Sequence, residues 1–197
     1  KEIKALADLA HRYDMYLFID GTRMANACAY LNLSLKEMTV DCEVDIFTIG
    51  GTKNGLMMGE VVVPLRKELA ENLTYYRKQA TQLYSKMRFI SAQFITYFKE
   101  NIWLENARKS NAAAQQLAGK MIKIKDVQIT QKVQSNSVFF ILPKPITDKL
   151  RERYFFYDWD ETRNEMRLVC SWDTTENDIS SFIDYLKQIA EKNDSCV

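Results

Sequence analysis

Residues 16–23 (YLFIDGTR) and residues 45–55 (DIFTIGGTKNG) each contain a short apolar run that stops at an ionisable residue beside glycine. Such runs are typical of buried strands in a sheet covered by helices. The first run ends at Asp20, and the second leads through two glycines to Lys53. Because open α/β sheets bind ligands at the carboxyl ends of their strands, we expect both side chains at one binding site.

An amine and a carboxylate at neighbouring strand ends suit a cofactor that is both an aldehyde and a pyridine. Lys53 can form an imine with an aldehyde, and its glycine neighbours allow a flat ring to approach. Asp20 can hold a pyridinium nitrogen and so strengthen the ring as an electron sink. The residues therefore predict pyridoxal 5′-phosphate (PLP). The alternatives are a turn lysine at Lys53 and an N-cap at Asp20 for a helix at Thr22, and the N-cap is compatible with cofactor binding.

The composition limits the possible partners. Of 197 residues, 47% are hydrophobic, which allows a sizeable core, and the net charge of +1 gives no reason to expect nucleic acid or a membrane as the partner. The cysteines are scattered, with no CxxC pair and no histidine nearby, so we expect free thiols and no metal site; they are Cys28, Cys42, Cys170 and Cys196. We expect a soluble, cytoplasmic protein.

The pattern of predicted elements changes near residue 119. Before it, helices are expected at 1–13, 22–31, 66–72, 82–99 and 103–118, with strands at 16–20, 45–49 and 59–64. After it, short strands are expected at 127–130, 137–142, 154–157 and 166–170, with helices at 143–153 and after the capping-box pattern that begins at Thr175. The second part therefore predicts a separate small α+β domain.

The first predicted helix opens the chain directly. In a βαβ unit such a helix follows a strand, so we infer that an N-terminal part of the protein precedes this sequence. His11, the only histidine, lies in this helix among charged neighbours and is predicted to be a solvated surface residue. On this interpretation the chain brings no histidine base.

Two arginines are candidates for binding anions. Arg23 follows Asp20 by three residues and can bind a substrate carboxylate, or pair with Asp41 or Asp45. Arg88 lies near the start of a predicted helix, where a phosphate can bind. A basic surface cluster is the alternative for Arg88.

These residues resemble the L-threonine aldolase/β-eliminating lyase family of PLP enzymes, which has the aspartate-aminotransferase-type fold. The D-G-A-R motif of the family is similar to residues 20–23, and its S-K-G lysine loop is similar to residues 52–55. The similarity continues through Met87-Arg88, the V-Q-S-N of residues 133–136 and the R-x-V-x-x-W-D of residues 167–173. This chain departs from the family at Thr22, at Asn54 and in residues 79–86, which replace alanine, glycine and a glycine-rich loop.

The resemblance implies a role for each of these residues. Lys53 would be the catalytic Schiff-base lysine, and Asp20 the catalytic partner of the pyridine nitrogen. Thr52 and Arg88 would complete the cofactor site, with Arg88 on the phosphate. Arg23 and Arg167 would bind the substrate carboxylate.

The resemblance also implies the architecture and the activity. Residues 1–115 would form the C-terminal part of a large α/β PLP-binding domain with a mostly parallel sheet flanked by helices, and residues 116–197 a small C-terminal α+β domain. The implied protein is a homodimer or homotetramer that cleaves L-threonine or L-allo-threonine to glycine and acetaldehyde. Other PLP-dependent β-eliminating lyases, aminotransferases and an inactive structural or interaction module are the alternatives.

The same resemblance implies that this chain is incomplete as a catalyst. The N-terminal half of the family supplies a phosphate loop and a histidine that stacks on the cofactor ring. We therefore expect the chain alone to bind PLP weakly or not at all and to be inactive.

Overall fold

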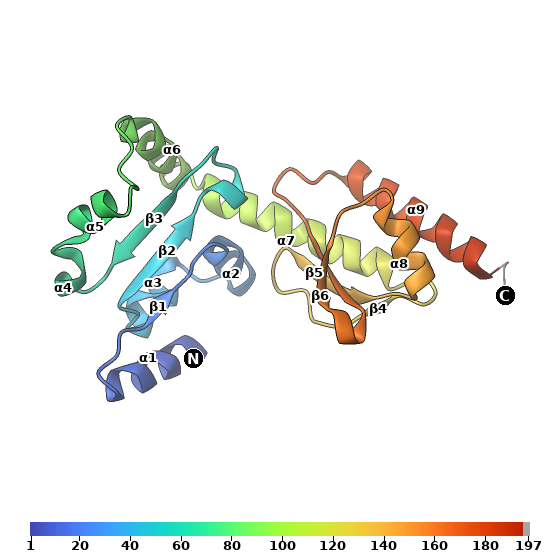
Figure 1. The fold of residues 1–197 in the computed structure, drawn as a ribbon, viewed down its shortest axis with the longest axis horizontal. Coiled ribbons are helices and arrows are strands. Elements are labelled where there is room, and N and C mark those ends of the chain that lie inside the picture. The colour runs from blue at the N-terminus through green and yellow to red at the C-terminus, as the bar shows by residue number, and fades with distance from the viewer. Residues whose placement is uncertain (195–197) are drawn as a thin grey trace. The chain divides into compact units, whose positions relative to one another are not determined.

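The computed structural model describes residues 1–194, with side chains to residue 192, so Cys196 lies outside the described residues. Contacts divide the chain after Asn106 into unit 1 and unit 2, which are described separately (Figure 1). Helix α7 (Ile102–Met121) crosses this division. The domain boundary expected near residue 115 stays a prediction.

Unit 1 consists of a small sheet with surrounding helices (Figure 1). In chain order its elements are α1 (Glu2–Arg12), β1 (Phe18–Ile19), α2 (Met24–Leu31), α3 (Leu35–Met38), η1 (Val40–Cys42), β2 (Ile46–Gly50), η2 (Thr52–Asn54), β3 (Glu60–Pro64), α4 (Lys67–Ala70), α5 (Leu73–Gln79) and α6 (Met87–Lys99). The strand order is β1-β2-β3. Strands β1 and β2 are parallel, as expected, whereas β3 runs antiparallel to β2, so this sheet is mixed.

The core of unit 1 explains the position of its central strand. Phe47 and Ile49 alternate along β2 and are buried with Val44, while Thr48 points away from this core. Apolar residues from neighbouring elements complete the cluster; they are Ile3, Leu17, Ile19, Leu35, Val63 and Phe98. Burial of one face fixes the register of β2 against β1, in which Ile19 lies opposite Phe47.

The helical region after β3 differs from the sequence prediction. A separate helix, α5, occupies Leu73–Gln79, and α6 begins at Met87 instead of residue 82. Thr81 adopts a left-handed backbone conformation with φ of 59°, which ends the helical path after α5. Residues 80–86 therefore form an irregular connection.

Unit 2 is an antiparallel sheet with helices on one face. Its strands and remaining helices are β4 (Gln128–Ile129), β5 (Ser137–Ile141), α8 (Lys144–Arg151), β6 (Tyr157–Asp160), η3 (Glu161–Arg163), β7 (Glu165–Val169) and α9 (Glu176–Asp194). The strand order is β4-β5-β7-β6. Residues such as Val138, Phe140 and Met166 pack with the apolar faces of α7, α8 and α9 into a single core.

Local sequence signals account for several boundaries. The capping box predicted at Thr175 is present: its hydroxyl accepts from the N–H of Asp178, whose carboxylate accepts from the N–H of Thr175. The strand predicted at 154–157 begins later, at Tyr157. The N–H groups of Arg153 and Tyr154 donate to the carbonyl of Leu150 and therefore form the turn that follows α8.

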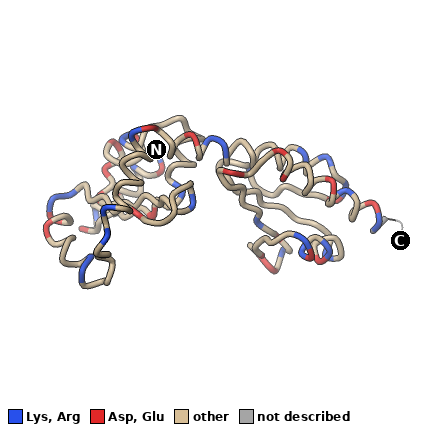
Figure 2. Tube along the Cα trace, turned by 90° about the horizontal axis from the view of Figure 1, so that it is seen from above, with Lys and Arg blue, Asp and Glu red and all other residues tan. Residues whose placement is uncertain are grey.

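The charged residues are distributed along the chain as its near-zero net charge suggests. Basic and acidic residues are interspersed along the trace (Figure 2). Among residues 1–194, no helix is both long enough and apolar enough to cross a membrane. The same residues hold no cluster of three or more histidine, cysteine or acidic side chains suited to a metal ion.

A buried carboxylate holds the beginning of β2 to α1. Asp45 is fully buried, and its Oδ2 accepts from the backbone N–H of Leu17 at 2.7 Å and lies 2.8 Å from Nε2 of His11. Its Oδ1 accepts from Nε of Arg66 at 2.7 Å. The prediction that His11 is a solvated surface residue is wrong, because its ring binds a buried acid. Asp45 joins segments that are far apart in the chain, a contact that periodicity does not reveal.

The environment of Asp45 makes unit 1 sensitive to acid. Burial by itself would raise the pKa of Asp45, but hydrogen bonds from Arg66, Leu17 and His11 outweigh it and lower the pKa below 3.8. A carboxyl with a lower pKa in the folded state adds stability above its unfolded pKa. That contribution is lost as the pH falls through the folded pKa.

We expect Asp45→Asn to lower the free energy of unfolding by about 1.5–3 kcal/mol at neutral pH, because a buried charge-assisted hydrogen-bond set is lost. Urea unfolding measures this change. Asp41→Asn is the matched control, since Asp41 is exposed and its ion pair with Lys36 lies at the surface, so its loss should change stability by less than about 0.5 kcal/mol. Equal losses in the two variants would contradict the structural role of Asp45.

Candidate active site

The ends of β1 and β2 lie against each other at one edge of the sheet. Because the two strands are parallel, their carboxyl ends share this edge. The N–H of Gly21 donates to Oγ1 of Thr48 at 3.0 Å. A Cβ on Gly21 would lie 1.8 Å from the carbonyl oxygen of Thr48, so only glycine allows this approach. The contact positions Asp20 beside the strand that leads to Lys53.

Asp20 is an exposed carboxylate held by a local turn. Its Oδ1 accepts from the N–H of Thr22 at 3.1 Å and from the hydroxyl of Thr22 at 2.7 Å. Helix α2 begins only at Met24, with Arg23 in the capping position, so the alternative interpretation of Asp20 as the N-cap of this helix is wrong. Oδ2 accepts no hydrogen bond from the described residues and can bind another group.

The pKa of Asp20 lies below its ordinary value. The hydroxyl of Thr22 contributes most to this lowering, followed by the backbone N–H of Thr22. The charges of Lys53 and Arg23 lower the pKa further. The carboxylate is therefore ionised at neutral pH, and it lies within electrostatic reach of the lysine and the arginine.

Lys53 lies in a short, well-defined loop. It occupies the middle of η2, where it is exposed between buried Gly51 and buried Asn54. The carbonyl of Gly51 accepts from the N–H groups of Asn54 and Leu56, at 3.0 and 3.1 Å. Gly55 closes the turn with φ of 108°, a conformation that favours glycine. The loop presents the lysine side chain outward from a fixed backbone.

The other predicted residues of unit 1 occupy different positions. Arg23 lies three residues after Asp20 and is half-buried, and Thr52 precedes Lys53 in η2. Arg88 lies in the first turn of α6, exposed, with its guanidinium 5.1 Å from the ring centre of Phe89. Among the described residues, no hydrogen bond or ion pair joins Arg88 to the strand ends. The structure brings together Asp20, Arg23 and Lys53, and leaves Arg88 as a helix-start arginine.

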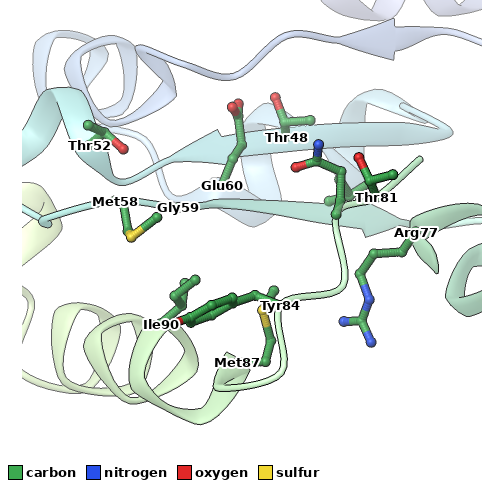
Figure 3. A pocket seen from close by; sticks show the side chains of 12 residues that line it. Thr48, Thr52, Met58, Gly59, Glu60, Arg77, Thr81, Tyr84, Met87 and Ile90 are labelled. Atoms are coloured by element: carbon green, nitrogen blue, oxygen red, sulfur yellow. The ribbon is translucent and has the colours of Figure 1, made fainter. Parts of the chain in front are cut away.

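A cavity of about 850 Å³ adjoins the lysine loop (Figure 3). Strands β2 and β3 line it on one side, through Thr48 and Glu60, and the segment from α5 to α6 lines it on the other, through Arg77 and Tyr84. Thr52 also lines it, whereas Lys53 does not. Arg77 therefore shares a cavity with Thr52. From the sequence we selected Arg88, and not Arg77, as the candidate for binding a phosphate. The run of basic and aromatic residues at 75–78 was the signal that pointed to Arg77.

Arg167 lies in unit 2, in the middle of β7. It pairs in register with Phe139 of β5 and with Tyr157 of β6. Its guanidinium carbon is 5.2 Å from the ring centre of Tyr157 and 5.1 Å from that of Trp159. Trp159 in turn packs edge-on against Phe139 at 5.0 Å. Within residues 1–194, Nε of Arg167 is buried and has no hydrogen-bond partner.

The side chains at this sheet edge in unit 1 fit PLP. An exposed amine on a rigid loop suits the aldehyde, and an ionised carboxylate with one uncommitted oxygen suits the protonated ring nitrogen. The close approach at Gly21 keeps the two groups at one sheet edge. The hydroxyl of Thr52 and the arginines can serve a phosphate or a carboxylate.

Comparison with solved structures identifies the class of fold. A threonine aldolase from Leishmania major superposes with a TM-score of 0.86 and 28% identity, covering 96% of this chain and 56% of that chain. Glutamate decarboxylase from Lactobacillus brevis superposes with a TM-score of 0.70 at 15% identity, over 95% of this chain and 50% of that chain, which shows the fold alone. The chain thus has the α/β fold of PLP-dependent transferase-type enzymes and covers part of it.

Comparison of sequences identifies the family. The profile of the beta-eliminating lyase family matches residues 1–144, and the chain belongs to this family, whose members depend on PLP. It is 36% identical over 176 residues to a low specificity L-threonine aldolase from Pseudomonas sp., covering 89% of this chain and 51% of the relative. A protein of the same name from Pseudomonas aeruginosa is also 36% identical, over 173 residues. The chain spans about half the length of these relatives.

Replacing Thr22 by alanine tests the origin of the low pKa of Asp20. We expect Thr22→Ala to raise the pKa of Asp20 towards 3.8, because the largest lowering contribution comes from the Thr22 hydroxyl. Thr22→Ser, which keeps the hydroxyl, should leave the pKa low. A ¹³C NMR titration of the Asp20 carboxyl measures both values. An unchanged pKa in Thr22→Ala would show that neighbouring charges, and not this turn, set the ionisation.

Proposed function

We propose that the whole protein containing this chain is a PLP-dependent aldehyde-lyase that cleaves L-threonine or L-allo-threonine to glycine and acetaldehyde. The observation that carries the proposal is the placement of an exposed lysine and an ionised aspartate at one sheet edge. The 36% identity to proteins named low specificity L-threonine aldolase supports the choice of substrate.

Each residue of the candidate site then has a defined task. PLP, when bound, supplies the electron sink for breaking the bond between the α- and β-carbons of the amino acid. Lys53 would hold the cofactor at its aldehyde, and Asp20 would keep the ring nitrogen protonated through its uncommitted Oδ2. Thr52 would contact the cofactor from the lysine loop, with Arg88 at the phosphate. Arg77, which shares a cavity with Thr52, is a further candidate for the phosphate.

Arg23 and Arg167 would bind the carboxylate of the amino-acid substrate. For Arg167, contact with the rings of Tyr157 and Trp159 restricts the guanidinium, and its unsatisfied Nε–H requires an acceptor. A carboxylate can accept two parallel hydrogen bonds from such a group. An arginine that orients the substrate carboxylate would contribute to catalysis through positioning.

A homodimer or homotetramer is part of the proposal for the whole protein. Large apolar side chains are exposed on α5 and α6, including Tyr75, Tyr76, Phe89 and Ile95. An apolar surface of this kind suits contact with another protein surface.

Lys53→Ala in the whole protein should abolish acetaldehyde release from threonine, because it removes the amine that holds the cofactor. In the unmodified protein, borohydride reduction followed by peptide mass spectrometry should find the cofactor attached at Lys53. Lys78→Ala, at an exposed lysine of α5, is the control and should retain activity. Release of pyruvate or ammonia instead of acetaldehyde would identify a different PLP reaction. Attachment at another lysine would overturn the role of Lys53.

Arg167→Lys should raise KM for threonine by roughly 10- to 100-fold, because a two-point carboxylate contact worth about 1.5–3 kcal/mol is lost. Steady-state kinetics measures the change. The matched control is Arg153→Lys, because Arg153 also stacks on two rings, those of Tyr154 and Tyr185. A similar KM for the two variants would remove Arg167 from the substrate site.

A further inference from the structure

Asn54 directly follows the candidate cofactor lysine and points into the protein. It is 4% exposed, whereas Lys53 is exposed, so the loop turns one side chain outward and the next one inward. Asn54 also stands where the lysine loop of the related family has glycine. A buried amide side chain at this place needs partners, and it has them.

The partners of Asn54 come from two helices far along the chain. Its Nδ2 donates to the hydroxyl oxygen of Tyr97 on α6, and to the carbonyl oxygen of Trp103 on α7 at 2.8 Å. The backbone carbonyl oxygen of Asn54 accepts from Nδ2 of Asn106 at 2.9 Å. Three hydrogen bonds thus tie the residue beside Lys53 to the junction of α6 and α7.

The groups that hold Asn54 are themselves immobilised. Tyr97 is fully buried, and its ring packs edge-on against Phe94 and Phe98 at 6.1 and 5.4 Å. Burial raises the pKa of Tyr97 to about 12, so its hydroxyl stays neutral at physiological pH. Trp103 and Asn106 are buried in the first turns of α7.

We propose that Asn54 is a positioning residue that fixes the backbone of Lys53. This inference rests on the proposed role of Lys53. The turn around Lys53 is closed by hydrogen bonds to Gly51, which hold its shape but do not attach it to the helices. A separate hydrogen bond, from the N–H of Met57 to Oε1 of Gln93 on α6 at 3.0 Å, attaches the segment that follows the turn. Without the Asn54 contacts the turn can rotate about Gly51 and Gly55, and the backbone that carries the Lys53 side chain is no longer held in one position.

Amide hydrogen exchange in the cofactor-free whole protein tests the attachment directly. In Asn54→Ala, the N–H of Leu56 should exchange on the order of 10- to 100-fold faster, because buried hydrogen bonds that resist local opening are lost. Asn106→Ala should speed the same N–H without altering the loop sequence, and it keeps the test decisive if Asn54→Ala does not fold. Thr39→Val is the control, since it removes a buried hydrogen bond to Leu35 at the other end of β2 and should leave the loop unchanged.

Steady-state kinetics then tests whether the hydrogen bonds of Asn54 affect the function of Lys53. For threonine cleavage, Asn54→Ala and Asn106→Ala should lower kcat by roughly tenfold or more and leave KM nearly unchanged, whereas Thr39→Val should change neither. Unaltered exchange at Leu56 in both variants, or faster exchange with an unaltered kcat, would overturn the proposal. The proposal would also be overturned if Thr39→Val changed the exchange at Leu56 and kcat as much as the Asn54 and Asn106 variants do.

Failure of this inference and failure of the proposed function give different results. If Lys53→Ala abolishes activity while the Asn54 and Asn106 variants behave like the unmodified protein, Lys53 keeps its role and Asn54 loses its own. If Lys53→Ala leaves the activity intact, the proposed function fails. The exchange at Leu56 still decides in that case whether Asn54 holds the loop.

Discussion

The candidate site in unit 1 depends on the parallel contact between β1 and β2. That pairing is short, and it places the end of one strand beside the other only because Gly21 has no side chain and can donate to Thr48. The contact brings Asp20 to the edge of the sheet from which the Lys53 loop emerges. Without it, the acid and the amine would belong to separate loops, and neither would have a defined partner.

The two aspartates at opposite ends of this strand pair show how environment assigns a role to a carboxylate. Asp45, directly before β2, is fully buried, and its two oxygens are held by His11 of α1, the backbone N–H of Leu17 and Arg66. Asp20, at the end of β1, is exposed, and one of its oxygens is uncommitted. Both have a lowered pKa, but only Asp20 can offer its charge to a ligand. The first carboxylate stabilises the fold, and the second is available for chemistry.

Most of the elements were predictable because their signals are local. The capping box at Thr175, the apolar runs before Asp20 and Lys53, and the helical periodicity of α1 and α6 depend on neighbours within a few residues. The predictions failed where contacts are distant. His11 binds an acid 34 positions away. A different error is local: the helix expected from residue 82 begins only at Met87, after the left-handed backbone of Thr81 has ended the path of α5. Membership of the beta-eliminating lyase family was also recognisable from ordered motifs, because the family resemblance is carried by short segments.

The sequence by itself determined the strand ends, the lysine and aspartate beside them, and the capping box at Thr175, since each follows from residues adjacent in the chain. Only the tertiary structure decided that β3 runs antiparallel, that Arg77 shares a cavity with Thr52, that two rings stack on Arg167, and that Asn54 is held by α6 and α7. The physical reason is the same in each case. These features arise from packing and hydrogen bonds between residues separated in the chain, for which local propensity and periodicity carry no information.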